Sequence, residues 1–104
     1  MIIVTGHVVT NAENRAAIEA EGVAHCQRSR AEPGCIAHNC YWDIEHTDRL
    51  VFVEKWADAG ALLKHFAVPE SGAFVKAVSA LSDEPPVLEI YRAEAIDPTA
   101  LASG

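Results

Sequence analysis

The sequence is short of cysteine, of positive charge and of long hydrophobic runs, and each shortage narrows the class of protein. Its three cysteines are odd in number and include no Cys-x-x-Cys pair, so we expect reduced thiols and no disulfide framework. Only 8 lysines and arginines accompany 15 aspartates and glutamates, which gives a formal net charge of −7 at pH 7. Such an acidic surface repels phosphate groups, and this argues against nucleic-acid and membrane partners.

Targeting segments and several catalytic motifs are also missing. No stretch approaches the roughly 20 apolar residues of a transmembrane helix, and the first four residues lack the basic segment of a signal peptide, so we expect a cytoplasmic protein. The five histidines show no His-x-His, His-Glu-x-x-His or His-x3-His spacing, so we expect no metal site. No glycine-rich phosphate loop or Gly-x-Ser-x-Gly motif occurs, and Cys35 and Cys40 lie in no motif of nucleophilic catalysis.

The 104 residues, 50% of them hydrophobic, correspond to one domain, which we place over residues 1–96 with a tail over 97–104. β-Branched runs, caps and Pro-Gly breaks predict the elements. We expect strands over residues 2–10, 35–45, 49–56 and 87–96, and helices over 12–31, 59–66 and 71–81, with a kink at Pro69. With the last two helices counted as one, the order β-α-β-β-α-β is that of the ferredoxin-like α+β fold, one sheet with its helices on one face.

The first predicted helix has a thin apolar stripe. Asn11 is expected to cap this helix, and Gly22 is expected to weaken it. The stripe consists mostly of small side chains, namely Ala12, Ala16, Ala20, Val23 and Cys26. On this pattern His25 is expected to face solvent, as is His46 in the predicted hairpin turn, and we assign neither a role.

The strands are apolar on both faces. By alternation, Leu50, Phe52 and Trp56 of the third strand lie on one face, while Val51 and Val53 lie on the other. A sheet with helices on one side only should present polar side chains to water on its other side. Because the chain has helices for one face, we predict that a second copy covers the other face in a homodimer.

The same alternation places Glu54 beside Phe52 and Trp56, on the face toward the helices. A helix that returns over the sheet could bring His65 near Glu54 and Trp56, where a histidine, a carboxylate and an indole could form a proton-transfer site. Structural alternatives stay open: His65 could bind carbonyls at its helix end, Glu54 could hold backbone amides, and Trp56 could belong to the core. His38 could also point inward from the second strand.

Three local strings stand out as a set. They are Ser-Arg-Ala-Glu-Pro-Gly-Cys over 29–35, Phe-Val-Glu-Lys-Trp-Ala-Asp over 52–58 and Leu-Leu-Lys-His-Phe over 62–66, followed by Pro69 and Phe74. In this order and spacing they resemble the antibiotic biosynthesis monooxygenase domain, the group that includes quinol monooxygenases. The resemblance runs from about residue 2 to residue 92.

The resemblance implies a dimeric α+β barrel, in agreement with the two-faced strands. It also implies that O2 oxygenates a small aromatic phenol, quinol or anthrone with no cofactor, neither metal nor flavin. His65 and Glu54 would be the catalytic residues, His65 as base or partner of the substrate anion and Glu54 as the group that orients the site. The residues in contact with the substrate would be Trp56, Phe52, His38 and Phe74.

Two other functions are compatible with the same barrel. The chain could be a non-catalytic module that binds a small apolar metabolite or haem. It could also be an isomerase or lyase that uses His65 for proton transfer without oxygen.

Overall fold

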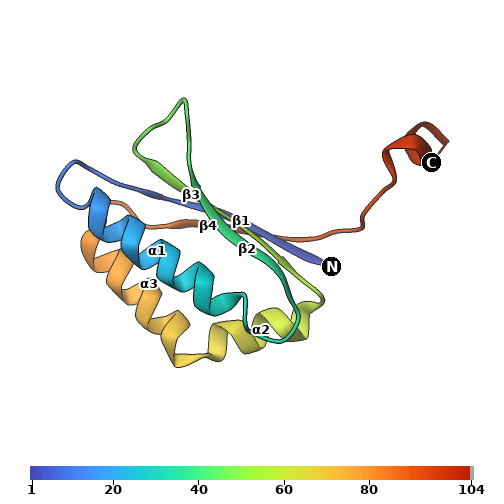
Figure 1. Cartoon of the computed structure of the whole chain (residues 1–104), viewed down its shortest axis with the longest axis horizontal. Coiled ribbons are helices and arrows are strands. Elements are labelled where there is room, and N and C mark those ends of the chain that lie inside the picture. The colour runs from blue at the N-terminus through green and yellow to red at the C-terminus, as the bar shows by residue number, and fades with distance from the viewer. Residues whose placement is uncertain (104) are drawn as a thin grey trace.

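The computed structural model describes residues 1–103 as one sheet with helices packed on one of its faces (Figure 1). The strands are β1 Ile2–Val9, β2 Cys35–Trp42, β3 Arg49–Trp56 and β4 Val87–Arg92, and the helices are α1 Arg15–Ser29, α2 Ala59–Ala67 and α3 Pro69–Leu81. A short 3-10 helix, η1, follows over Pro98–Ser103. Within the described residues, no helix is both long enough and apolar enough to cross a membrane.

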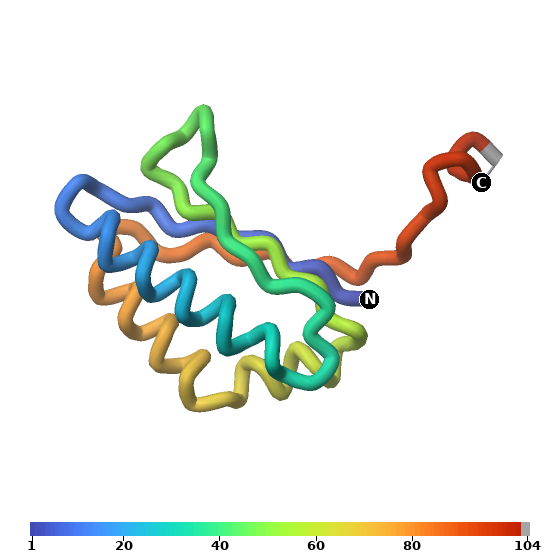
Figure 2. Tube along the Cα trace, viewed as in Figure 1, coloured from blue at the N-terminus to red at the C-terminus, as the bar shows by residue number. Residues whose placement is uncertain are grey.

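The four strands form an antiparallel sheet in the order β2-β3-β1-β4. This order and the alternation of strands with helices confirm the predicted ferredoxin-like α+β fold. Figure 2 shows that the chain leaves β4 beside the N-terminus and runs away from the helices toward η1. The site therefore has to be sought between the sheet and its helix layer.

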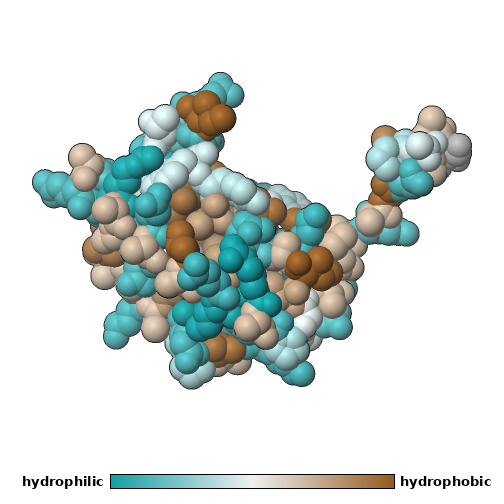
Figure 3. Space-filling model, viewed as in Figure 1, coloured by the Kyte–Doolittle hydropathy of each residue, from teal (hydrophilic) through white to brown (hydrophobic). Residues whose placement is uncertain are grey.

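The helix layer covers one face of the sheet. α1 and α3 lie side by side across it, and α2 follows β3 and covers the end of the sheet near the N-terminus (Figure 1). On the side seen in Figure 3, hydrophilic and moderately hydrophobic side chains are interspersed, and the most hydrophobic ones occur in small groups. The apolar sides of these helices face the sheet, which is where the core forms.

Several element boundaries differ from the predicted ones, and short polar side chains explain two of them. Asn11 Oδ1 accepts hydrogen bonds from two amides of a turn that precedes the helix, so α1 begins at Arg15 and not directly after Asn11. Asp43 Oδ1 likewise accepts from two amides, and β2 ends at Trp42 instead of residue 45. Pro69, expected as a kink, is the first residue of α3. β4 ends four residues before its predicted end.

The predicted apolar stripe of α1 was wrong, because four of its five members are exposed. The buried side of α1 instead consists of Ile18, Gly22, His25, Cys26 and Ser29. Gly22 has a packing role: a Cβ there would lie 3.0 Å from Leu50 Cδ2 and 3.1 Å from Phe52 Cζ. The missing side chain lets α1 approach β3 closely, and this sets how near the buried side of α1 comes to the sheet.

The core divides into two apolar clusters. The first lies under α1 and α3 and consists of Val8, Ile18, Cys26, Leu50, Phe52 and Val78. The second lies under α2 and consists of Ile2, Val4, Trp56 and Leu62. Glu54 stands on β3 between Phe52 of the first cluster and Trp56 of the second, so a buried carboxylate interrupts the core at its centre.

The other face of the sheet carries apolar side chains, as the alternation predicted. Val51 and Val53 of β3 lie there with Ile3 of β1, and on the neighbouring strands Tyr41 and Tyr91 are 56% and 48% exposed. The helices α1, α2 and α3 all lie on the opposite side of the sheet (Figure 1). Whether a second copy covers this face therefore stays a prediction.

Candidate active site

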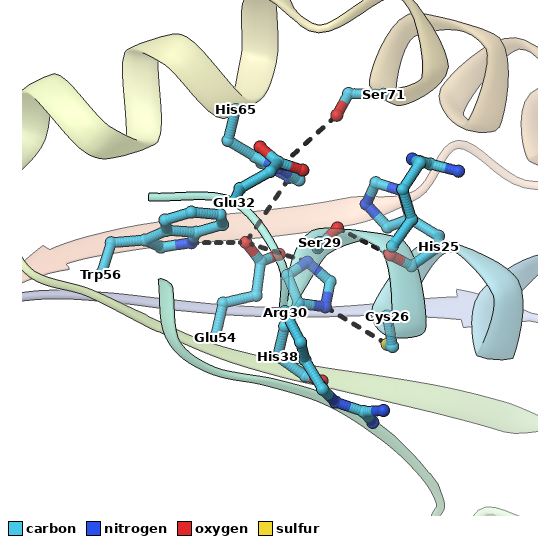
Figure 4. A network of polar contacts seen from close by, with 11 residues as sticks. His25, Cys26, Ser29, Arg30, Glu32, His38, Glu54, Trp56, His65 and Ser71 are labelled. Carbon is cyan, nitrogen blue, oxygen red and sulfur yellow. Dashed lines mark hydrogen bonds and ion pairs between the residues drawn. The ribbon is translucent and has the colours of Figure 1, made fainter. Parts of the chain in front are cut away.

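Glu54 is a buried carboxylate at the centre of the candidate site, only 6% exposed. Its Oε1 atom accepts a hydrogen bond from Trp56 Nε1 at 2.9 Å and lies 3.3 Å from His38 Nε2. His65 Nε2 lies 4.0 Å from the same oxygen. Figure 4 shows these side chains turned toward one another from β2, β3 and α2.

The pairing of β2 with β3, and the return of α2 over the sheet, bring these side chains together. His38 on β2 is paired with Glu54 on β3, so the two side chains stand side by side on one face. Trp56 follows Glu54 by two residues and shares that face. His65 lies in the last turn of α2, whose N-terminus is capped by the side chain of Asp58. The structure thus brings together four of the six predicted site residues.

Glu54 is ionised at neutral pH. Burial alone would raise its pKa, but the interaction with His38 and the hydrogen bond from Trp56 outweigh burial and hold the pKa of Glu54 below its ordinary 4.5. His38 is completely buried, and its Nδ1 atom lies 3.2 Å from Cys26 Sγ. Burial raises the pKa of the Cys26 thiol to about 12, so the thiol is neutral and can donate to His38 Nδ1. The ring proton of His38 then lies on Nε2, where it faces Glu54.

Glu32 holds His65 from the other side. His65 Nδ1 lies 3.1 and 3.2 Å from the two carboxylate oxygens of Glu32, and Ser71 Oγ is 3.5 Å away. A carboxylate only accepts hydrogen bonds, so His65 Nδ1 carries a proton, and in the neutral ring the lone pair is on Nε2, toward Glu54. A carboxylate that fixes the tautomer of a histidine in this way is the arrangement that orients a general base.

Sequence reasoning did not select Glu32, although it singled out the Glu-Pro-Gly string in which Glu32 lies. In that string Gly34 has a φ of +83°, and a Cβ there would lie 2.5 Å from Ala61 Cβ on α2. Glycine therefore permits both the left-handed backbone and the close passage of this loop past α2. That passage places Glu32 beside His65. The Glu-Pro-Gly string was the sequence signal for this part of the site. Glu32 was still not selected, because the path of a loop produces no periodic pattern in the sequence.

His25 was expected to face solvent, and this was wrong: its side chain is buried at 5% exposure. Its ring stacks on Phe74 with centroids 4.0 Å apart, and its Nδ1 atom lies 2.6 Å from a guanidinium nitrogen of Arg28. Burial, followed by the nearby charges of His38, His65 and Arg28, lowers the pKa of His25 from 6.5 to about 3. His25 is therefore neutral near pH 7. It lies on the buried side of α1, which the predicted apolar stripe had placed elsewhere on the helix.

An apolar cavity of about 260 Å³ opens between the sheet, α1 and α3. Three of the predicted site residues line it, Phe52, Glu54 and Phe74, together with His25. The rest of the wall is Gly6, His7, Val8, Val75, Val78, Pro86, Val87 and Leu88. A cavity of ~150 Å³ holds benzene, so this one has room for a small aromatic compound.

The other three predicted site residues lie outside the cavity lining. His65, Trp56 and His38 are 3%, 0% and 0% exposed and surround Glu54 away from the cavity. Two polar side chains of the lining reach the buried histidines His38 and His65: Glu54 through its carboxylate, and His25 through ring contacts with centroids 5.0 and 5.2 Å away. Of these two, only Glu54 is a carboxylate that can accept a proton in the cavity and lies beside both histidines.

Comparison with known proteins identifies relatives. The sequence profile described as antibiotic biosynthesis monooxygenase matches residues 1–77. A protein of Synechocystis, the uncharacterized protein sll1783, is 30% identical over 91 residues. Those residues are 88% of this chain, and the chain spans 62% of the length of that relative.

Solved structures share the fold. A proposed antibiotic biosynthesis monooxygenase from Deinococcus radiodurans superposes with a TM-score of 0.89 at 28% identity, covering 93% of this chain and 97% of that one. Rv0793 from Mycobacterium tuberculosis superposes with a TM-score of 0.85 at 22% identity, covering 91% and 96%. The second likeness, at this lower identity, concerns the fold alone.

Loss of His25 should make the fold less sensitive to acid. Its pKa is about 3 in the folded chain and about 6.5 in the unfolded chain, so the unfolded state binds a proton first. The contribution of neutral His25 to stability is therefore complete above about pH 6.5 and is lost as the pH falls toward 3. The variant His25→Phe keeps a ring against Phe74. We expect its free energy of unfolding, measured with urea, to fall less than that of the wild type when the pH is lowered from about pH 7 to about pH 5.

The matched control is His46→Phe, because His46 is exposed. This variant should keep the pH dependence of the wild type. If His25→Phe and the wild type lost stability equally on acidification, His25 would not be a buried neutral histidine.

Proposed function

The chain belongs to the antibiotic biosynthesis monooxygenase family, and on that premise we propose that it oxidises a small electron-rich phenol, quinol or anthrone with O2, without a bound cofactor. The observation that carries the proposal is the ionised carboxylate of Glu54 in the wall of an apolar cavity of about 260 Å³. An apolar wall selects an aromatic substrate, and a single carboxylate in that wall selects one that carries an acidic proton. The pair His65 and Glu32 stands directly behind this carboxylate.

The first step is removal of a proton from the substrate. Glu54 accepts it at the cavity wall, and His65 Nε2, 4.0 Å from Glu54 Oε1, takes it onward. The carboxylate of Glu32 stabilises the imidazolium that results, because its oxygens lie 3.1 and 3.2 Å from Nδ1. The proton thus ends away from the cavity, and the substrate remains there as an electron-rich anion.

The oxygen step follows from the chemistry of that anion. The anion passes one electron to O2, and the substrate radical and superoxide combine at carbon to give a peroxide. Loss of water from the peroxide leaves a carbonyl group. The substrate supplies all four electrons, one oxygen atom enters the product and the other leaves as water. The protein contributes an apolar, water-poor cavity in which the anion is exposed to O2.

The remaining predicted site residues take two kinds of role in this proposal. Phe52 and Phe74 line the cavity and would pack against the ring of the substrate. Trp56 and His38 are too deeply buried to touch a molecule in this cavity, and they act as positioning residues for Glu54. For Trp56 and His38, predicted as substrate contacts, we propose this positioning role instead.

A second copy of the chain is the proposed cover of the open sheet face. Val51 and Val53 lie at the centre of that face, and exposed tyrosines at positions 41 and 91 extend it. An open face that carries these apolar side chains, among polar ones such as Thr5 and Asn39, favours burial against a second copy in a two-fold symmetric dimer. Face-to-face packing of two such sheets would complete an α+β barrel.

Glu54→Gln should abolish most oxidation while leaving the fold intact. The amide oxygen of glutamine still accepts from Trp56 Nε1, but the side chain no longer accepts the proton of the substrate. We expect kcat/KM to fall by about 10²–10⁴-fold in an O2-electrode assay with a panel of hydroquinones and anthrones. Glu13→Gln, at an exposed position near the start of α1, is the matched control and should keep wild-type rates.

Assays of the wild-type protein with and without O2 distinguish a monooxygenase from the alternative functions. No O2 uptake by folded wild-type protein across the panel would remove the support for a monooxygenase. Turnover of the same compounds under nitrogen would point instead to an isomerase or lyase.

Val53→Lys should dissociate the proposed dimer. A charge at the centre of the open sheet face would be buried without a partner in the interface, whereas the monomer can hydrate it. We expect analytical ultracentrifugation to show a dimer for the wild type and a monomer for Val53→Lys, with Val23→Lys on the exposed side of α1 unchanged. A wild type that stays monomeric at micromolar concentration would contradict the barrel.

A further inference from the structure

Three histidine rings meet beneath the sheet, from α1, β2 and α2. His25, His38 and His65 form a nearly equilateral triangle, with ring centroids 5.0, 5.2 and 5.4 Å apart. All three are buried, and one ring nitrogen of each lies within 4.8 Å of the other two. We propose that these three histidines and Glu54 form a binding site for one divalent transition-metal ion of the zinc type.

The spacing fits tetrahedral coordination. Zinc binds histidine nitrogen at ~2.0–2.1 Å, which places two ligand nitrogens ~3.4 Å apart and their ring centroids ~5 Å apart. The three ring centroids already have the ~5 Å separation that such a site requires. The 3.3 Å between His38 Nε2 and Glu54 Oε1 matches the ~3.4 Å expected between two ligand atoms. His65 Nε2 lies 4.0 Å from Glu54 Oε1 and needs only a small ring movement to reach the same distance.

The outer nitrogens of two rings are held as they are in metal sites. His38 Nδ1 contacts Cys26 Sγ, and His65 Nδ1 contacts the carboxylate of Glu32. The carboxylate of Glu32 holds the proton of His65 on Nδ1 and so leaves Nε2 for a metal, whereas a metal at His38 Nε2 requires that ring proton to move to Nδ1, where Cys26 Sγ can accept it. His38 Nε2 is also fully buried and makes no hydrogen bond of acceptable geometry, so it is a polar atom that points into the site without a satisfying partner.

The charges favour a cation at this position. The carboxylate of Glu54 lies 3.3 Å from His38 Nε2 and 4.0 Å from His65 Nε2, so it adds an acidic oxygen ligand to the imidazole nitrogens. Imidazole and carboxylate donors suit zinc and its first-row neighbours. Because His25 and Glu54 line the cavity, an ion could enter from there.

Arg28 opposes binding in a way that can be tested. Its guanidinium donates to His25 Nδ1 at 2.6 Å, so the ring proton of His25 lies on Nε2. A metal at Nε2 requires that proton to move to Nδ1, and a guanidinium cannot accept a hydrogen bond from it. The carbonyl of a glutamine at position 28 can accept it, so Arg28→Gln should strengthen metal binding.

The metal site does not rest on the proposed oxidation. An ion bound to His65 Nε2 would occupy the lone pair that the proton transfer uses, so the two uses of His65 exclude each other. Metal binding is measured without turnover, and failure of one proposal therefore leaves the other standing.

The test is a titration of the chelator-stripped full chain with Co2+, followed by competition with Zn2+. We expect one ion per chain and the intense visible absorption of tetrahedral cobalt, which the aqueous octahedral ion lacks. His25→Phe should weaken binding by at least ~100-fold, and Arg28→Gln should strengthen it by ~10-fold. His46→Phe, at an exposed histidine outside the cluster, should bind as the wild type does.

Three results would overturn the site. They are no stoichiometric binding, an octahedral cobalt spectrum, or binding that His25→Phe leaves unchanged while circular dichroism shows that the variant is folded. If His25→Phe does not fold, Arg28→Gln decides, because Arg28 lies at the edge of the cluster and its replacement adds no buried group. Unaltered or weaker affinity in Arg28→Gln would then contradict the proposed geometry.

Discussion

A buried carboxylate must be surrounded by hydrogen-bond donors or lose its charge, and this requirement of Glu54 organises the centre of the molecule. Trp56 of the same strand donates a hydrogen bond, and His38 Nε2 of the paired strand lies 3.3 Å away. A third group, His65, arrives from the helix that returns over the sheet. Apolar clusters on both sides keep water away, so these groups replace solvent around the charge. The same isolation that makes the carboxylate costly makes it useful at the wall of a cavity.

Alternation along strands made one part of this site predictable. A side chain on a strand returns to the same face every two residues, so the sequence alone places Phe52, Glu54 and Trp56 on one face. The approach of His65 followed from a short turn and a helix that must fold back over the sheet. The ferredoxin-like order and the apolar second face of the sheet followed from the same kind of pattern. These features depend on local geometry, which the sequence determines directly.

The parts that could not be predicted depend on how elements sit against one another. His25 was misplaced because the predicted stripe of α1 followed small apolar residues, whereas Gly22 sets the buried side through its close contact with β3. Glu32 was missed because a left-handed glycine at position 34 carries its loop past α2. The roles given to Trp56 and His38 changed for a related reason. Alternation shows which face a side chain is on, but not whether it borders a cavity or lies behind another residue.

The ionisation state of Glu54 can be observed directly by infrared difference spectroscopy, with Glu54→Gln as the reference. Because the pKa of Glu54 lies below its ordinary 4.5, wild-type protein at about pH 7 should show the carboxylate stretches of Glu54, and these should persist as the pH falls to 4.5. A carboxylic-acid carbonyl band at neutral pH that disappears in Glu54→Gln would contradict this expectation. In that case the donors from His38 and Trp56 do not overcome burial, and Glu54 cannot accept a proton from a molecule in the cavity.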